Sequence, residues 1–183
     1  LILTNRQRLE TIYGPTETGG VMAKLFELAD HEKVEGAVVL VENNAAVAAA
    51  YTAWTANATT LADNTLANAV ADAIRGLALS LFASGPNIEY VVIVGDDQVI
   101  PFRRIGEGNL SQVESTYALA LGNASTVAAA LAQNQILTDD YYTDKEPSQW
   151  KGNELYIPDY ASSRLIETPA EMIGVIDTFL AKQ

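Results

Sequence analysis

The sequence predicts an α/β protein: three layers, with a mostly parallel sheet and helices on both of its faces. Two apolar runs, residues 36–41 and 88–94, carry this prediction. The first run is continuous rather than alternating, which is typical of a parallel strand buried on both faces. Segments with helical periodicity separate the runs, and right-handed crossovers would place these helices on both sides of the sheet.

The first quarter of the chain is predicted to form a strand, two helices and a strand, at residues 1–4, 6–13, 20–32 and 36–41. Asn5 can cap the first helix, because its side chain can accept a bond from a free N–H of the first turn. Gly14 and Pro15 are expected to stop that helix. The second helix carries an apolar stripe at the spacing of one helical face, which predicts that this face is buried.

The middle of the chain is predicted to hold two helices, the clearest strand and an extended segment, at residues 45–56, 63–83, 88–94 and 98–106. Asp63 can cap the second of these helices. Its predicted buried stripe consists of Leu66, Val70, Ile74, Leu77 and Leu81. Pro101 argues against a central strand in the extended segment, because proline cannot donate to a strand ladder.

The last part is predicted to contain two Ala-rich helices (109–121 and 124–133) and then an acidic loop (138–153). Two short strands (154–157 and 159–165) and a helix (169–183) follow. Thr168, Pro169 and Glu171 fit the N-cap, the first turn and the capping box of the final helix. This helix is expected to bury Met172, Ile176, Phe179 and Leu180.

We expect residues 1–183 to form a single α/β domain. The chain begins at Leu1, with a strand-like run and without a methionine. It is therefore interpreted as an excised piece of a longer protein.

The charge balance excludes some partners. Lys and Arg number 11 and Asp and Glu number 23, giving a net charge of −12. Such a surface repels phosphate backbones and anionic membrane surfaces, so no nucleic-acid partner is expected. The two uncharged stretches, residues 43–62 and 115–138, are interrupted by polar residues. No membrane insertion is therefore predicted.

Catalytic chemistry has few candidate side chains. The chain has no cysteine and one histidine. A disulfide, a thiolate nucleophile and a Cys/His zinc site are therefore excluded within it. His31 lies near a predicted helix end and is interpreted as a solvated end residue, not as a base. No glycine-rich phosphate loop is present. The chain alone is thus predicted not to be an enzyme.

The acidic pairs are the candidate ligand site. Five carboxylates are candidate metal ligands, and they could offer oxygens to Ca²⁺: Asp96, Asp97, Asp139, Asp140 and Asp144. The alternative is that these short side chains cap turns at strand ends. A flavodoxin-like phosphoacceptor role for Asp96 or Asp97 is a further alternative, although no strand-end lysine accompanies it. The adjacent Arg103 and Arg104 could neutralise these aspartates or join one surface ion network.

Three segments, taken in order, resemble the gingipain-like cysteine peptidases of the C25 type, which have caspase-like folds. Residues 90–101 are similar to that family's apolar strand followed by Gly-Asp and Ile-Pro. Residues 137–142 resemble its Ser/Thr-Asp-x-x-Tyr segment. Residues 158–165, followed by 167–171, resemble its Pro-Asp-x-x-x-Gly-Arg-Leu strand and the next helix. Ser163 stands where the family has glycine.

The resemblance covers roughly residues 88–183 and implies half of a caspase-like α/β domain. In the family, the catalytic His and Cys follow the helix that here starts at Pro169, so no residue of this chain can inherit either role. The resemblance therefore implies a non-catalytic N-terminal portion of a peptidase domain. This portion would supply sheet and helices to a catalytic part that is absent here.

The implied partner is the remainder of the same polypeptide. A homodimer through an exposed sheet edge is also expected, because an open edge strand can pair with another strand. The resemblance implies a bacterial protein, and secretion or a cell-surface location is common in the family. The alternative function is a small-ligand or Ca²⁺ binding α/β module without peptidase activity.

Overall fold

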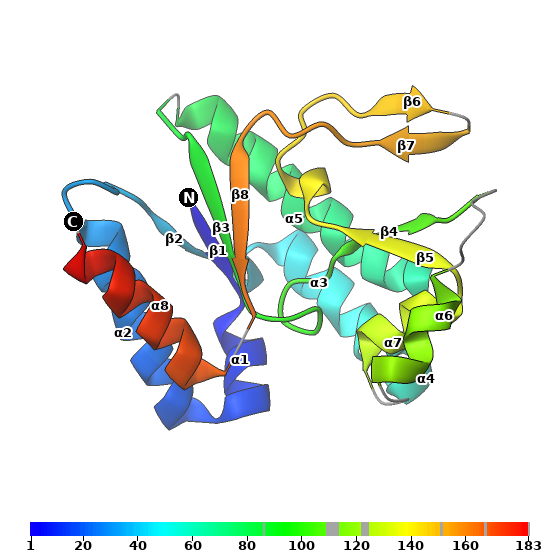
Figure 1. Ribbon diagram of the computed structural model, residues 1–183, viewed down its shortest axis with the longest axis horizontal. Helices are drawn as coiled ribbons and strands as arrows, with labels where there is room; N and C mark the ends of the chain where they lie inside the picture. The colour runs from blue at the N-terminus through cyan, green and yellow to red at the C-terminus, as the bar shows by residue number, and fades with distance from the viewer. Residues whose placement is uncertain (86, 109–113, 122–124, 151, 167, 183) are drawn as a thin grey trace. The chain divides into compact units, whose positions relative to one another are not determined.

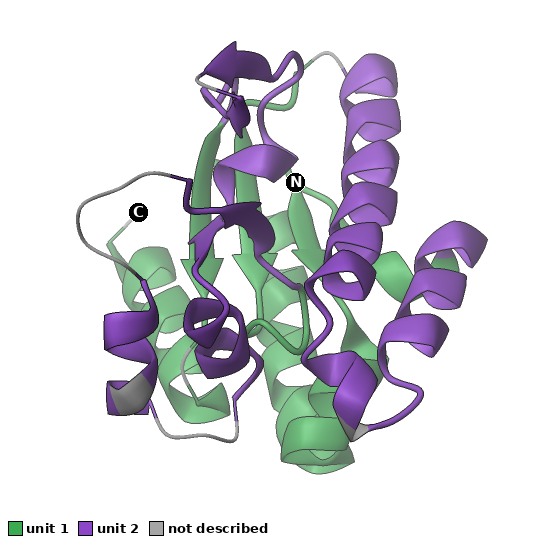
Figure 2. Cartoon of the chain, turned by 90° about the vertical axis from the view of Figure 1, so that its right-hand side faces the viewer, with its two compact units in different colours: residues 1–43, 87–100, 161–183 green, residues 44–86, 101–160 purple. Residues whose placement is uncertain are grey.

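The computed structural model describes residues 1–85, 87–108, 114–121, 125–150, 152–166 and 168–182 (Figure 1). The chain forms two compact units, which are coloured separately in Figure 2. Unit 1 comprises residues 1–43, 87–100 and 161–183. Unit 2 comprises residues 44–86 and 101–160.

Unit 1 contains a four-stranded, all-parallel sheet with the strand order β2-β1-β3-β8. The strands are β2 (Val38–Leu40), β1 (Ile2–Thr4), β3 (Tyr90–Val94) and β8 (Ala161–Leu165). Ile2 lies opposite both Val38 and Val92, and Tyr90 lies opposite Ala161. The predicted α/β class, with a parallel sheet flanked by helices, is confirmed.

The core of unit 1 lies between the sheet and two helices, α2 (Pro15–Asp30) and α8 (Pro169–Ala181). The two helices lie side by side in Figure 1, and Lys24 of α2 forms an ion pair of 2.7 Å with Asp177 of α8. Apolar side chains from all of these elements form one buried cluster that includes Ile2, Leu25, Val94 and Met172. Burial of each such large side chain contributes about 1.5–3 kcal/mol.

The helix starts in unit 1 follow local sequence signals. Asn5 caps α1 (Arg6–Tyr13) by accepting a bond of 3.0 Å from the N–H of Arg8, as predicted. Glu171 accepts a bond from the N–H of Thr168 and completes the predicted capping box of α8. The predicted start of α2 was wrong: the helix begins at Pro15, not at residue 20. Proline lacks an N–H and suits a first turn, so Pro15 opens α2 directly after Gly14 ends α1.

Unit 2 holds helices and two antiparallel strand pairs. Its helices are α3 (Ala45–Trp54), α4 (Ala58–Leu61), α5 (Asn64–Ser84), α6 (Ser115–Ala118) and α7 (Thr126–Ala132), with 3₁₀ turns η2 (Leu119–Leu121) and η3 (Asp140–Tyr142). Its strands are β4 (Arg103–Gly106), β5 (Gln135–Thr138), β6 (Ser148–Trp150) and β7 (Asn153–Leu155). β4 pairs with β5, and β6 pairs with β7. The sequence predicted neither α4, β5 nor β6.

Several burial predictions were wrong in detail. β2 is a half-buried edge strand, and residues 41–43 form a further 3₁₀ turn, η1 (Val41–Asn43), where a strand buried on both faces was expected. Phe179 of α8 is 39% exposed, whereas Met172 and Ile176 are buried as predicted. Residues 109–113 and 122–124 of the predicted Ala-rich helices lie outside the described residues.

Helix α5 buries a different face from the predicted one. Asp63 caps it as predicted, and Val70 and Ile74 are buried. The predicted Leu66, Leu77 and Leu81 are only partly buried. The fully buried positions beside Val70 and Ile74 are small: Ala67, Ala71 and Ala78. Small side chains allow close approach of neighbouring elements, so the face that α5 buries is alanine-rich.

Helix α5 is also the one helix of the described residues that is long and apolar enough to cross a membrane, by length and composition. Core helices pass the same test. In unit 2, Ile74 and Phe82 of this helix are buried, while Asp72 and Arg75 bond to other residues of the unit.

Candidate functional site

The carboxyl edge of the parallel sheet is where α/β proteins commonly bind their ligands. In unit 1, the turns that follow β1, β2 and β3 begin at this edge. They carry Asn5, Glu42 and the residues 95–97. The predicted candidates Asp96 and Asp97 therefore lie at this edge, as expected from the strand preceding them.

The turn after β3 depends on Gly95. Its φ is +109°, a backbone conformation that residues other than glycine rarely adopt. A Cβ atom at this position would lie 2.3 Å from the Cβ of Val99. Asp96 closes the turn, because its Oδ1 accepts bonds from the N–H groups of Gln98 (2.9 Å) and Val99 (3.1 Å). This is an Asx turn, so Asp96 has the capping role that was the alternative to metal binding.

Arg164 of β8 binds the same turn. Its Nη1 donates to the carbonyl oxygens of Gly95 and Ile100, each at 2.8 Å. Hydrogen bonds from a charged donor contribute about 1.5–3 kcal/mol. The turn after β3 is thereby fixed to the neighbouring strand β8.

The N-terminus of α1 at this edge is occupied by side chains of unit 1. Oε1 of Glu42 accepts bonds from the N–H groups of Arg6 (3.0 Å) and Gln7 (3.3 Å). Arg8 donates from Nε to the carbonyl oxygen of Gln98 at 2.8 Å. A free helix N-terminus attracts anions, and here a carboxylate of the chain itself takes that position.

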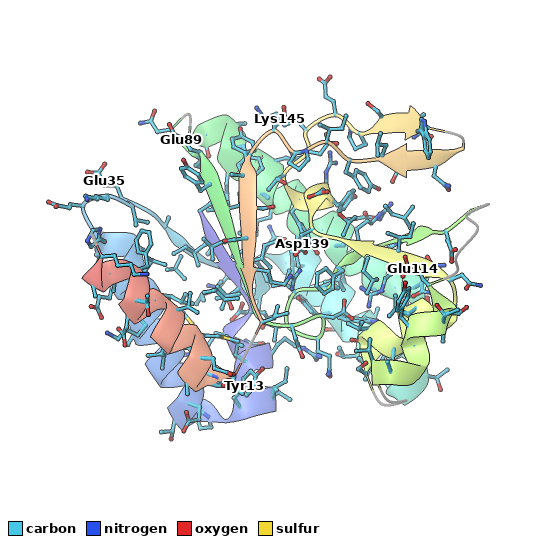
Figure 3. The ribbon with its side chains drawn as sticks, in the orientation of Figure 1. Tyr13, Glu35, Glu89, Glu114, Asp139 and Lys145 are labelled. Carbon is cyan, nitrogen blue, oxygen red and sulfur yellow. The ribbon has the colours of Figure 1, made fainter. Side chains whose placement is uncertain are left out.

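The remaining candidate aspartates belong to unit 2. Asp144 is 3% exposed and accepts bonds of 2.7 Å from the N–H groups of Glu146 and Ile157, one on each carboxylate oxygen. Asp139, labelled in Figure 3, precedes η3, and its carbonyl oxygen accepts a bond from the N–H of Tyr142. Asp140 donates its N–H to the hydroxyl of Thr138. All three lie in or beside one tight turn.

Asp97, by contrast, is a buried residue of unit 1, 2% exposed. The five candidate ligands are thus divided between the units, with two in unit 1 and three in unit 2. Within the described residues, no group of three or more His, Asp or Glu side chains is arranged to hold a metal ion. Calcium binding stays a prediction.

A polar cluster in unit 2 was not predicted. Arg103 forms ion pairs with Asp72 of α5 (2.7 Å) and Glu154 of β7 (3.1 Å), and its Nε donates to the hydroxyl of Tyr156. Of the two alternatives for this arginine, the ion network describes Arg103, whose ion-pair partners come from elements distant in the sequence. The hydroxyl of Tyr141 donates to Asp72, and its ring lies 4.4 Å below the Arg103 guanidinium.

This cluster shifts the ionisation of its members. Burial raises the pKa of Tyr156 to about 12, and the bond to Glu154 acts in the same direction. Burial, and then the bond to Asp72, also raise the pKa of Tyr141. The hydroxyl of Tyr156, and then the guanidinium of Arg103, lower the pKa of Glu154. The arrangement thus favours neutral phenols and an ionised Glu154. The ion pairs of Arg103 join β4 to α5 and β7.

Arg104, the neighbour of Arg103, is a buried structural group. It is 3% exposed, and its guanidinium lies 5.5 Å from the ring centre of Trp54. Its backbone N–H and C=O both bond to the side chain of Asn68 on α5. Trp54 is fully buried, whereas Trp150 is 53% exposed.

His31 follows α2 as its C-cap, which confirms its predicted place at a helix end. Its Nδ1 accepts a bond from the N–H of Lys33, and its ring meets Phe179 edge-on. These contacts are consistent with a structural role for His31 at the C-terminus of α2.

Comparison of the chain with protein family models, curated proteins and solved structures finds no match.

Proposed function

We propose that this chain is the non-catalytic N-terminal portion of a gingipain-like cysteine peptidase domain. It would supply sheet and helices to a catalytic part that is absent here. The support is the resemblance of three ordered segments, together with the way those segments bond to one another.

The observation that carries the proposal is the pair of hydrogen bonds that Arg164 donates to the carbonyl oxygens of Gly95 and Ile100. Arg164 belongs to the third resembling segment, and both acceptors belong to the first. Tyr142, from the second segment, donates its hydroxyl to the carbonyl oxygen of Pro101, the last residue of the first. Three short similarities that arose by chance would have no reason to be hydrogen-bonded to one another. This mutual bonding favours a shared architecture.

The chemistry of the sheet edge also favours a structural role. Glu42, Asp96 and Arg164 bond to backbone groups of unit 1 at the edge where a ligand would bind. The chain has no cysteine to act as the nucleophile, and its one histidine ends a helix. The residues present thus build and close the sheet edge, and the chemistry would come from another part of the polypeptide.

The test is to determine the sequence that follows Gln183 in the reading frame of the longer protein. We expect a His-Gly pair and then a Cys, each following an apolar strand-like run. The longer protein should then be labelled by a thiol-reactive peptide probe, and replacing that Cys by Ser should abolish the labelling. A continuation without the pair would overturn the proposal. So would peptide hydrolysis by this pure chain that persists in the presence of thiol reagents.

The alternative, a Ca²⁺ or small-ligand module, has no comparable support. Asp96 and Asp144 already accept backbone hydrogen bonds that shape their own turns. The calcium measurement described in the Discussion separates the two functions.

A further inference from the structure

Strands β6 and β7 of unit 2 form a two-stranded ladder of their own within the part of the chain that the structure describes. Ser148 lies opposite Leu155 at the open end of this hairpin. Pro147 precedes β6, and Pro158 follows soon after β7. Because proline has no N–H group to donate, these residues favour a ladder that ends at the base of the hairpin.

A buried carboxylate fixes this base. The two oxygens of Asp144 accept bonds of 2.7 Å from the N–H groups of Glu146 and Ile157, which lie on opposite sides of the hairpin. The N–H of Asp159 donates to the carbonyl oxygen of Thr143 at 2.9 Å. Asp144 and Thr143 are buried, so the base is anchored in the interior of unit 2.

The side chains of β7 and of the two residues after it alternate in an unusual sense. Glu154 and Tyr156 point toward unit 2 and bond to Arg103. Leu155 and Ile157 are 43% and 64% exposed. Successive side chains of a strand point to opposite sides, so the outward side is the apolar one. The hairpin is therefore not held in place by its aliphatic side chains.

Arg103 instead holds β7 through polar contacts. Its Nη2 pairs with Glu154 at 3.1 Å, and its Nε donates to the hydroxyl of Tyr156 at 3.2 Å. Its Nη1 pairs with Asp72 of α5 at 2.7 Å. The planar guanidinium can bind several groups at once in a fixed geometry. The ring of Tyr156 also meets that of Tyr141 edge-on, and Tyr156 is buried.

We propose that the hairpin of β6 and β7 is a hinged strap, which opens about its base at Asp144 and is latched closed by Arg103. Opening breaks the bonds of Arg103 to Glu154 and Tyr156 and leaves its ion pair with Asp72 in place. The guanidinium, whose side chain is 17% exposed in the closed state, then loses its cover from β7. Segments that open locally are those with few buried apolar contacts, as in this hairpin.

Salt should favour the open state. The side chain of Glu154 is 41% exposed, so dissolved ions can screen its attraction to Arg103. The hydrogen bonds of the buried Asp144 are screened much less. Rising salt is therefore expected to release the strap while its base stays in place.

Hydrogen exchange of single amides, followed by NMR, measures the opening. A free two-stranded hairpin is only marginally stable in water, so its ladder amides exchange once the latch is broken. The paired amides of β7 should exchange at least about tenfold faster than those of β4 and β5. Low concentrations of urea should change the β7 rates little, because a local opening exposes little surface.

The amide of Ile157 tests the hinge, since it donates to Asp144 at the base. It should exchange as slowly as the amides of β4. Equal rates in β7 and in β4 and β5, rising together with urea, would overturn the proposal. A fast amide at Ile157 would overturn the hinge, because the base would then open with the strap.

A charge substitution tests the latch. Glu154→Gln keeps the size of the side chain and removes its charge, so the β7 amides should exchange about two- to fivefold faster and lose most of their salt dependence. Glu27→Gln is the matched control, because Glu27 forms an exposed ion pair with Lys24 in unit 1. It should change neither property.

Unchanged β7 rates in Glu154→Gln, or the same increase in Glu27→Gln, would refute the latch. The free energy of unfolding of both variants shows whether the fold as a whole is retained. The inference does not rest on the proposed function, and its failure would leave the peptidase test unaffected.

Discussion

Arg164 donates from Nη1 to the carbonyl oxygen of Gly95 at 2.8 Å, and so joins β8 to the turn after β3. The two residues are 69 positions apart in the chain. Gly95 is also bonded through its own N–H to the carbonyl oxygen of Leu165. Both backbone polar groups of Gly95 are thus bonded to residues of β8. Arg164 and Gly95 can each be substituted to test this connection.

Arg164→Lys should destabilise the protein by about 1–3 kcal/mol, because an ammonium group cannot reproduce a planar guanidinium bonded to two carbonyls. The free energy of unfolding in urea measures the effect. Arg6→Lys is the matched control. Arg6 forms an exposed ion pair with Glu10, and its replacement should cost less than about 0.5 kcal/mol. Equal effects of the two variants would contradict a structural role for Arg164.

Gly95→Ala should destabilise the fold by at least about 1–3 kcal/mol, because its positive φ strains any side chain and Val99 fills the space. Gly174→Ala is the control in α8 of the same unit, where nothing lies within 4 Å of the added Cβ. That change should stabilise by about 0.5–1 kcal/mol, as expected for a helix interior. Thermal and urea unfolding of both variants check the opposite signs.

The Tyr156 phenol should make the fold sensitive to alkali. Its pKa is raised from 10.0 to about 12 in the folded state, so the protonated form stabilises the protein below pH 10. That contribution is lost as the pH rises from 10 toward 12, because the unfolded state releases its proton first. In urea unfolding at a series of pH values, Tyr156→Phe should lose stability less steeply than the native chain across this window.

Tyr117→Phe serves as the control for this series, since Tyr117 is 55% exposed. Its curve should follow that of the native chain. Parallel curves for the native chain and Tyr156→Phe would mean that Tyr156 is not the group responsible.

Asp144 should act as a structural acceptor rather than as a calcium ligand. Asp144→Ala leaves the N–H groups of Glu146 and Ile157 without their acceptor, and should cost about 1–3 kcal/mol. Millimolar Ca²⁺ or Mg²⁺ should leave the melting temperature of the native chain unchanged. A rise in that temperature that is lost in Asp139→Asn or Asp140→Asn would instead support the calcium-binding alternative, because a ligand of the native state adds stability.

The elements predicted correctly depend on neighbours in the sequence. Asn5, Asp63 and Thr168 were identified as caps because a capping side chain and the N–H group that donates to it lie within one turn. The run of apolar residues that forms β3 was equally clear, since Val91, Ile93 and Val94 are buried.

The elements that were missed depend on distant partners. β5 and β6 are short, with four and three residues, and they are paired with β4 and β7. Pro15 was read as a stop, although the same residue type also opens helices. For such segments, tertiary context decides between two locally acceptable conformations.

The candidate site was predicted in part. The position of Asp96 at the end of β3 followed from the strand pattern, and its turn-forming role was one of the three alternatives for this residue. The cluster of Arg103 with Asp72 and Glu154 was missed, because its members come from α5, β4 and β7. The Arg103-Arg104 pair was its one sequence signal. An ion network was one of the two alternatives for this pair, but the sequence did not identify Asp72 and Glu154 as its partners.

The interleaving of the two units has a consequence for synthesis of the protein. Unit 1 is built from three separate stretches, and its strand β8 ends at residue 165 of 183. On the ribosome, β1 therefore emerges long before its sheet can be completed. Neither unit consists of one uninterrupted stretch of the chain. A product of early termination that lacks β8 would therefore expose the edge of β3 that β8 covers.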